Sequence, residues 1–310
     1  MSEVTSVIEV DSLVVEYGKG NKKVRAVDGI SFQVKPGECV GFIGANGAGK
    51  STTIKSLMGF LFPSSGEVRV FGHPAGKAKS RQRIGYLPEV ALYYPFMKAK
   101  ELLQLYGGLH GMKSSDLHSR IPEILKRVGL GNKEDTLLQN FSKGMQQRLG
   151  IAQSLISDPE LLIFDELSSG LDPLGRHDLR DVLLEIKKAG RTIFFSSHEL
   201  TEVETLCDRI LIIHHGKIIR EASVNELIKP LNEYEIIFRL TDNQEMPVEI
   251  AGLNPVQEGE VYHLVISGID LYSKVLAELS SHDCIIQNTS SRSLSLEDHF
   301  IHLVREMEGK

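Results

Sequence analysis

A glycine-rich segment stands between an apolar run and a stretch with helical character. It begins at Gly44, and after four intervening residues come Gly49, Lys50 and Ser51, which is the spacing of a phosphate-binding loop. Glycines allow backbone N–H groups to curl around a phosphate, and the N-terminus of the following helix adds a favourable dipole. The lysine of such a loop reaches the β- and γ-phosphates, and the serine hydroxyl binds Mg²⁺. We therefore predict that ATP and Mg²⁺ bind at Gly44, Ala45, Asn46, Gly47, Ala48, Gly49, Lys50, Ser51 and Thr52.

Two neighbouring carboxylates end another apolar run, Leu161–Phe164. Asp165 is suited to hold Mg²⁺ through water, and Glu166 is suited to orient and deprotonate an attacking water. By itself such a pair usually marks a strand that reaches solvent. Because a phosphate-binding loop occurs in the same chain, we favour a metal-binding role for Asp165 and a general-base role for Glu166, and hence hydrolysis of the bound nucleotide.

A guanine-reading alternative rests on residues 132–135, which spell the NKxD sequence of P-loop GTPases. They lie in a polar turn between helical segments rather than at the end of an apolar strand. No DxxG sequence follows the strand that ends at Phe164. We therefore interpret residues 131–136 as a loop and expect ATP rather than GTP as the ligand.

Short apolar runs alternate with helical patterns around the candidate residues. Strand-like runs such as Leu161–Phe164 and Ile210–Ile213 are separated by segments with apolar residues at helical spacing. This alternation predicts a mostly parallel sheet covered by helices on both faces. We predict an α/β fold with a P-loop nucleotide-binding core and a helical subdomain at about residues 95–157.

Alternating runs near the start of the chain predict a separate antiparallel β subdomain. The runs Val7–Val10, Leu13–Glu16 and Ile30–Val34 alternate apolar and polar residues, as half-buried strands do. Two later runs, Glu67–Phe71 and Arg83–Tyr86, are expected to pair with each other.

A domain boundary is predicted at Pro230. Residues 223–226 fit a capping box, and the short helix that they start stops at Pro230. Residues 1–229 then form the nucleotide-binding domain and residues 230–310 a small α+β accessory domain. In the accessory domain we expect strands at Tyr234–Leu240, Tyr262–Ile266 and Cys284–Gln287, and helices at Leu271–Leu279 and Leu296–Met307.

Composition narrows the class of protein. The chain has 310 residues, of which 41% are hydrophobic and 25% charged, as in ordinary globular proteins. Its net charge of -6 argues against a nucleic-acid partner. Its three cysteines are far apart and predict reduced thiols in the cytosol. No apolar run approaches the ~18–20 residues that cross a bilayer.

Further motifs follow one order along the chain. Glu89 ends Gly85–Glu89, Ser142 to Gly144 lie in Phe141–Met145, and Asp172 ends Ser169–Asp172. His198 closes the run Phe194–His198, and Tyr17 stands in the early β region. Together with the phosphate-binding loop and the carboxylate pair, these motifs resemble the ATP-binding subunit of an ABC transporter. The resemblance covers about residues 6–225.

The resemblance implies a role for each motif. Tyr17 would stack on adenine, Glu89 would lie at the Q-loop position near Mg²⁺, and His198 would be the switch histidine that senses the γ-phosphate. Ser142, Lys143 and Gly144 would form the signature segment, which contacts the γ-phosphate held by the opposite subunit, so that two chains sandwich two ATP molecules. This sequence departs from the family pattern at Glu89, where glutamine is most frequent, and at Lys143 and Met145, where glycine and glutamine are usual. Leu167 and Ser168 also stand where Pro-Thr is more frequent.

Within the family, the residues around Glu89 and Ser142 and the tail at residues 295–300 resemble bacterial ATPases that pair with ABC-2-type export permeases. The resemblance implies a homodimer or a pair with a similar chain, a separate transmembrane permease as partner, and a cytoplasmic location on the inner face of the membrane. The aromatic residues 92–96 would contact the permease or belong to the core of the helical subdomain. The alternatives are a soluble ABC-type ATPase that acts on ribosomes or DNA, and a regulatory module without hydrolysis, against which Glu166 and His198 argue.

Overall fold

The computed structural model describes residues 6–18, 22–167, 171–227, 230–241, 249–282, 284–293, 296–297 and 305. The chain divides into two compact units, Met1–Val224 and Asn225–Lys310. The division falls within the short helix α8 (Val224–Leu227), whereas the sequence predicts a boundary after that helix.

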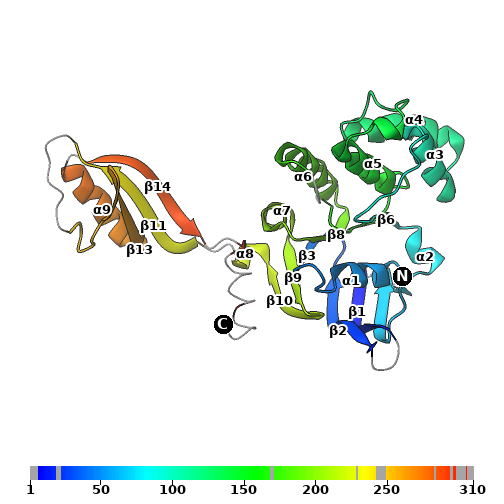
Figure 1. The fold of residues 1–310 in the computed structure, drawn as a ribbon, viewed down its shortest axis with the longest axis horizontal. Coiled ribbons are helices and arrows are strands. Elements are labelled where there is room, and N and C mark those ends of the chain that lie inside the picture. Colours follow the sequence, from blue (N-terminus) through cyan, green and yellow to red (C-terminus); the bar gives the residue numbers. More distant parts are fainter. Residues whose placement is uncertain are drawn as a thin grey trace. The chain divides into compact units, whose positions relative to one another are not determined.

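The larger sheet of the first unit has the strand order β10-β9-β3-β8-β7-β6 (Figure 1). Five of its strands are parallel, and the edge strand β10 pairs antiparallel with β9. The predicted, mostly parallel sheet is therefore confirmed. Because parallel strands end at the same edge, the segments that follow β3, β6, β7 and β8 lie near one another. The bounds of the strands are β3 (Cys39–Ile43), β6 (Ile84–Leu87), β7 (Leu161–Phe164), β8 (Thr192–Ser197), β9 (Arg209–His214) and β10 (Lys217–Ser223).

A second sheet has the order β2-β1-β4-β5 and is antiparallel, and an antiparallel β subdomain is what the sequence predicts. The two predicted runs near the start form one strand, β1, whose pairing shifts between Val10 and Leu13. Ser12 has a φ of 49° there, so the strand continues through an irregularity. The bounds are β1 (Ile8–Tyr17), β2 (Val24–Val34), β4 (Ser65–Val70) and β5 (His73–Pro74).

The expected pairing of Glu67–Phe71 with Arg83–Tyr86 is wrong. Strand β4 pairs with β1 and β5, whereas β6 pairs with β7 in the parallel sheet. The helix α2 (Ala78–Arg81) lies between the two segments in the sequence. An apolar run has to be buried, and either sheet can bury it. Two runs that are close in sequence therefore need not pair with each other.

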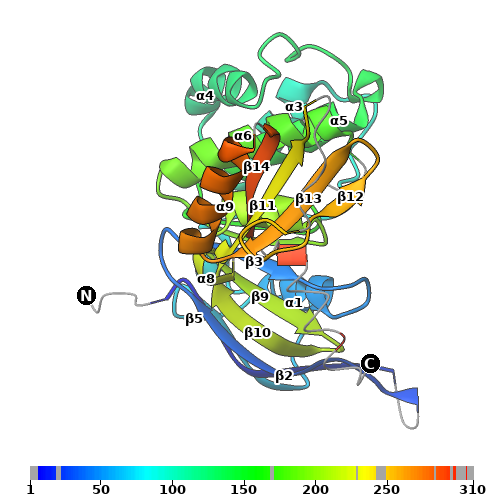
Figure 2. The ribbon, with the colours of Figure 1, turned by 90° about the vertical axis from the view of Figure 1, so that its left-hand side faces the viewer.

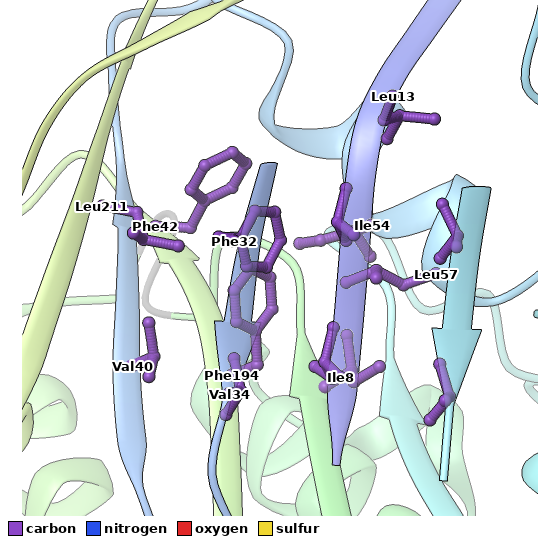
Figure 3. Packing of buried hydrophobic residues seen from close by; sticks show 14 of the residues in the cluster. Ile8, Leu13, Phe32, Val34, Val40, Phe42, Ile54, Leu57, Phe194 and Leu211 are labelled. Carbon is purple, nitrogen blue, oxygen red and sulfur yellow. The ribbon is translucent and has the colours of Figure 1, made fainter. Parts of the chain in front are cut away.

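One apolar layer joins the two sheets and the helix α1 (Lys50–Leu57). The ring of Phe32 on β2 stacks on that of Phe194 on β8, with 5.7 Å between centroids and an interplanar angle of 4°. Ile54 and Leu57 of α1 are fully buried in the same layer (Figure 3). The helix that follows the glycine-rich loop is thus fixed by packing from both sheets.

A helical group lies at one end of the first unit, away from β1 and β2 (Figure 1). It consists of α3 (Ala99–Leu109), α4 (Ser114–Arg127), a short 3₁₀ helix (Leu138–Asn140) and α5 (Lys143–Leu155). Two further helices, α6 (Pro173–Lys188) and α7 (Leu200–Leu206), follow β7 and β8. Among the described residues, no helix has the length and apolar character needed to cross a membrane.

The second unit is a four-stranded antiparallel sheet with the order β12-β13-β11-β14 and one long helix, α9 (Ile269–Ser281), along it (Figure 2). Its core contains Phe238 and Ile266 from the sheet and Leu279 from α9. The predicted α+β fold of this region is confirmed. The strands are β11 (Pro230–Arg239), β12 (Val256–Glu258), β13 (Val261–Ser267) and β14 (Ile285–Ser293). Of the expected helix at 296–307, all but residues 296, 297 and 305 lies outside the described residues.

Truncation of Phe194 tests the shared apolar layer. We expect Phe194→Ala to lower the free energy of unfolding by about 3–5 kcal/mol, because the ring is fully buried between the sheets. Phe62→Ala serves as the control, since Phe62 is 87% exposed, and it should change stability by less than about 0.5 kcal/mol. Urea unfolding followed by circular dichroism measures both, and equal stabilities would contradict the packing described.

Candidate active site

The glycine-rich loop between β3 and α1 is tightly enclosed. A Cβ atom on Gly44 would lie 2.4 Å from the carbonyl oxygen of Ile213, and one on Gly49 would lie 2.6 Å from that of Ala26. Gly49 also has a φ of +115°, a conformation that side chains disfavour. Only glycine fits these two positions, so the loop is restricted to one backbone conformation.

A pocket of about 290 Å³ opens beside this loop. Segments that are far apart in the sequence meet there, since Glu89 follows β6 and Glu166 follows β7. The other residues that line it are Ala26, Asn46, Gly47, Gly49, Lys50, Ser51 and Thr52. Most of the predicted phosphate-binding residues thus share one cavity with both acidic residues.

The amine of Lys50 is buried within the loop. Its Nζ donates to the carbonyl oxygens of Gly44 at 2.5 Å and Ala45 at 3.2 Å. It also lies 3.0 Å from Oε1 of Glu166, and the two side chains are only 5% and 9% exposed. A buried charge is costly unless it is paired. The ammonium of Lys50 and the carboxylate of Glu166 therefore each need the other in this buried position.

Asp165 is surrounded by hydroxyl groups. Its Oδ1 accepts hydrogen bonds from Ser51 Oγ at 3.1 Å and from Ser196 Oγ at 2.7 Å. A carboxylate and a hydroxyl at this distance form the all-oxygen environment that Mg²⁺ prefers, so the residues fit that ion. Ser196 is not among the residues predicted from the sequence, although its position before His198 at the end of an apolar strand is a usable signal.

Glu166 has an unusual backbone and two charged or titratable neighbours. Its φ is +50°, a left-handed conformation that is rare for a non-glycine residue. Its Oε2 lies 2.5 Å from Nδ1 of His198, while its Oε1 faces Lys50. The predicted catalytic pair, Glu166 and His198, is therefore in direct contact.

Two tyrosines lie near the site in different environments. The hydroxyl of Tyr17 is 3.2 Å from Oγ1 of Thr52, and the residue is 42% exposed, so that an aromatic face remains accessible beside the loop. Burial, with a contribution from the charge of Asp165, raises the pKa of Tyr86 to about 12. Tyr86 therefore stays neutral at physiological pH.

The signature segment lies apart from this pocket within one chain. Ser142 is the N-cap of α5 and accepts a hydrogen bond from the backbone N–H of Met145 at 3.3 Å. Lys143 is exposed, and Gly144 is half-buried. The described residues that line the pocket do not include Ser142, Lys143 or Gly144.

The expected D-loop is only partly described. Ser169 and Gly170 lie outside the described residues. Asp172 caps α6 by accepting from the backbone N–H of Gly175 at 2.8 Å. Arg176 connects this helix to the residue after His198, with 2.9 Å between its Nη1 and Oε1 of Glu199.

The fold and the pocket define a class of protein: a P-loop nucleotide hydrolase with the loop after one parallel strand and a pair of carboxylates after another. The ABC transporter family matches residues 27–169. An uncharacterized ABC transporter ATP-binding protein of Synechocystis is 39% identical over 92% of this chain and 80% of its own. The chain therefore belongs to the ABC transporter family, as an ATP-binding and ATP-hydrolysing subunit.

Two further relatives align over nearly the full length of this chain. The bacitracin transport ATP-binding protein BcrA of Bacillus licheniformis is 35% identical over 97% of this chain and 98% of its own. The Nod factor export ATP-binding protein I of Paraburkholderia xenovorans is 34% identical over 97% and 98%. A solved ATP-binding subunit of an ABC transporter aligns with a TM-score of 0.64 and 31% identity over 72% of this chain and 92% of its own. These likenesses favour a transporter subunit over an ATPase that acts on ribosomes or DNA.

Alanine substitutions in the loop test its enclosure. Gly49→Ala should destabilise the protein more than Gly47→Ala, because the added methyl group meets a backbone oxygen at Gly49 and no atom at Gly47. Gly47 has a φ of +80° with no atom within 4 Å of the added position, so we expect a cost of about 1–2 kcal/mol there. Thermal unfolding without nucleotide compares the stability of the two variants. Equal losses of stability would contradict this backbone conformation of the loop.

Proposed function

We propose that this chain is the ATPase subunit of a bacterial membrane exporter of the ABC-2 type, which works as a two-chain nucleotide sandwich. The observation that carries the proposal is the contact of Glu166 with both Lys50 and His198 at the edge of the pocket. The relatives named for bacitracin transport and Nod factor export support the transport role.

Glu166 is the general base in this proposal. It removes a proton from a water whose oxygen attacks the γ-phosphorus, while the bond from that phosphorus to the bridging oxygen breaks and ADP leaves. Lys50, freed from Glu166 when ATP binds, holds the β- and γ-phosphates. His198 orients the carboxylate through its Nδ1 and presents its other nitrogen to the γ-phosphate.

Mg²⁺ would be held by Ser51 and Asp165, with Glu89 at the same pocket. Bound there, the ion would neutralise charge on the phosphate oxygens. Ser196 keeps Asp165 in place by its hydrogen bond to Oδ1. Tyr17, beside Thr52, offers its exposed ring to the adenine base.

A second chain completes each site. Ser142, Lys143 and Gly144 form a capped helix N-terminus, which suits an anion, yet they lie outside the pocket of their own chain. In the proposed sandwich they contact the γ-phosphate held by the opposite chain. That chain is a second copy or a similar subunit.

A cluster of exposed apolar side chains supports a membrane partner. Val90, Leu92, Tyr94 and Phe96 follow Glu89, and Leu92 and Phe96 are 88% and 73% exposed. Tyr93 instead donates to Gln153 on α5, so the aromatic run is divided between the subdomain core and the surface. Apolar side chains that are exposed together mark interaction sites. We assign this surface to a separate permease, which would hold the chain at the inner face of the membrane. Asn225–Lys310 would be an accessory domain.

Replacement of Glu166 tests the catalytic assignment. Glu166→Gln should bind ATP and lower the turnover number by about 10²–10⁴-fold, because the general base is lost. Lys50→Ala should instead lose ATP binding, since the phosphate contact itself is removed. A phosphate-release assay with a fluorescent-nucleotide titration separates the two effects, and wild-type turnover of the Gln variant would refute the role.

A charge on the apolar cluster tests the membrane partner. Leu92→Asp should reduce recovery of a membrane protein with the tagged chain from detergent-solubilised membranes, because a carboxylate does not pack in an apolar interface. Val256→Asp is the matched control, since Val256 is exposed in the second unit. ATP affinity should be unchanged in both. Recovery of ribosomes and no membrane protein with the unaltered chain would overturn the exporter proposal.

A further inference from the structure

The left-handed backbone of Glu166 is held from both sides. Its own N–H donates to Ser196 Oγ at 2.9 Å. The carbonyl oxygen of the next residue, Leu167, accepts a hydrogen bond from the side-chain amide of Gln147. A left-handed conformation costs a non-glycine residue ~1–2 kcal/mol, and such strain persists where neighbouring groups over-determine it.

The two restraints come from different parts of the fold. Ser196 is fully buried on β8 and also donates to Asp165, so it belongs to the rigid edge of the parallel sheet. Gln147 stands early in α5, the helix that begins directly after Ser142. The restraint on the carboxyl side of Glu166 therefore comes from the helix that begins at the signature segment.

This second restraint acts on the backbone that carries the carboxylate. If α5 shifts, Gln147 no longer holds the Leu167 carbonyl, and the backbone at Glu166 is free to leave its left-handed conformation. The carboxylate then moves away from His198, which it contacts at 2.5 Å. A misplacement of about 1 Å in a catalytic group costs roughly 100-fold in rate.

We infer that Gln147 is a positioning residue, which makes the geometry of its own chain's Glu166 depend on the signature helix. This inference rests on the proposed two-chain sandwich, in which the start of α5 contacts the nucleotide of the opposite chain. ATP at one site then sets the general base of the other, through α5, Gln147 and the Leu167 carbonyl. The two sites are coupled without direct contact between the nucleotides.

Side-chain replacements test the hydrogen bond itself. Gln147→Met keeps a similar length and has no donor, so the turnover number should fall by about 10–100-fold while the dissociation constant of ATP stays unchanged. Gln147→Lys keeps a donor and should retain most of the turnover. Gln153→Met is the control, because that glutamine lies on the same helix and accepts a hydrogen bond from Tyr93 instead. Equal losses at 153 and 147, or full turnover of Gln147→Met, would overturn the inference.

Mixed dimers of full-length chains with two different tags decide which site Gln147 serves. The reference pairs an unaltered chain with Glu166→Gln, so that one general base remains. Gln147→Met should lower turnover when it is on the chain with the intact Glu166. It should have no effect when it is on the chain that carries Glu166→Gln. A loss in the second arrangement, or equal losses in both, would mean that Gln147 shapes the helix presented to the partner and would overturn the inference. A reference pair that does not associate with ATP would remove the sandwich itself.

Discussion

The buried pair of Lys50 and Glu166 constrains most of the site. Two opposite charges lie 3.0 Å apart with almost no exposure, and each would be strongly destabilising without the other. The pair forms only if the end of β3 and the end of β7 are held at a fixed separation. In the proposed function this geometry would give ATP a direct effect on catalysis: phosphates that bind Lys50 would take the place of Glu166 and release the carboxylate to act on water.

The sheet order provides that fixed separation. Strands β3, β8, β7 and β6 are consecutive neighbours, and the phosphate-binding loop, His198, the carboxylate pair and Glu89 follow them in turn. The stacked rings of Phe32 and Phe194 and the buried face of α1 join this sheet to the antiparallel one. The loop is therefore rigid on both sides, whereas the signature segment begins a helix of the separate helical group. That division suits a site whose second half comes from another chain.

Sequence reasoning was confirmed for the fold class and for the ATPase family, which rest on patterns and motifs within short stretches. The glycine-rich loop and the carboxylate pair also follow strands, as predicted, and their roles stay predictions. Sequence reasoning was wrong for the pairing of Arg83–Tyr86, because an apolar run indicates that a strand is buried but not which sheet the strand joins. It also missed Ser196 and Gln147, since a serine or glutamine acquires its role only from the group it meets across the fold.

By itself, the sequence determined the nucleotide chemistry, the order of the motifs and the class of fold, because glycine conformations and residue types within the motifs act over a few residues. Only the tertiary structure decided which oxygen of Glu166 faces Lys50 and which faces His198. It alone put Ser51 against Asp165, 114 residues away in the chain, and connected Gln147 to the backbone after Glu166. Contacts of this kind follow from strand order and helix packing, which no short stretch of sequence contains.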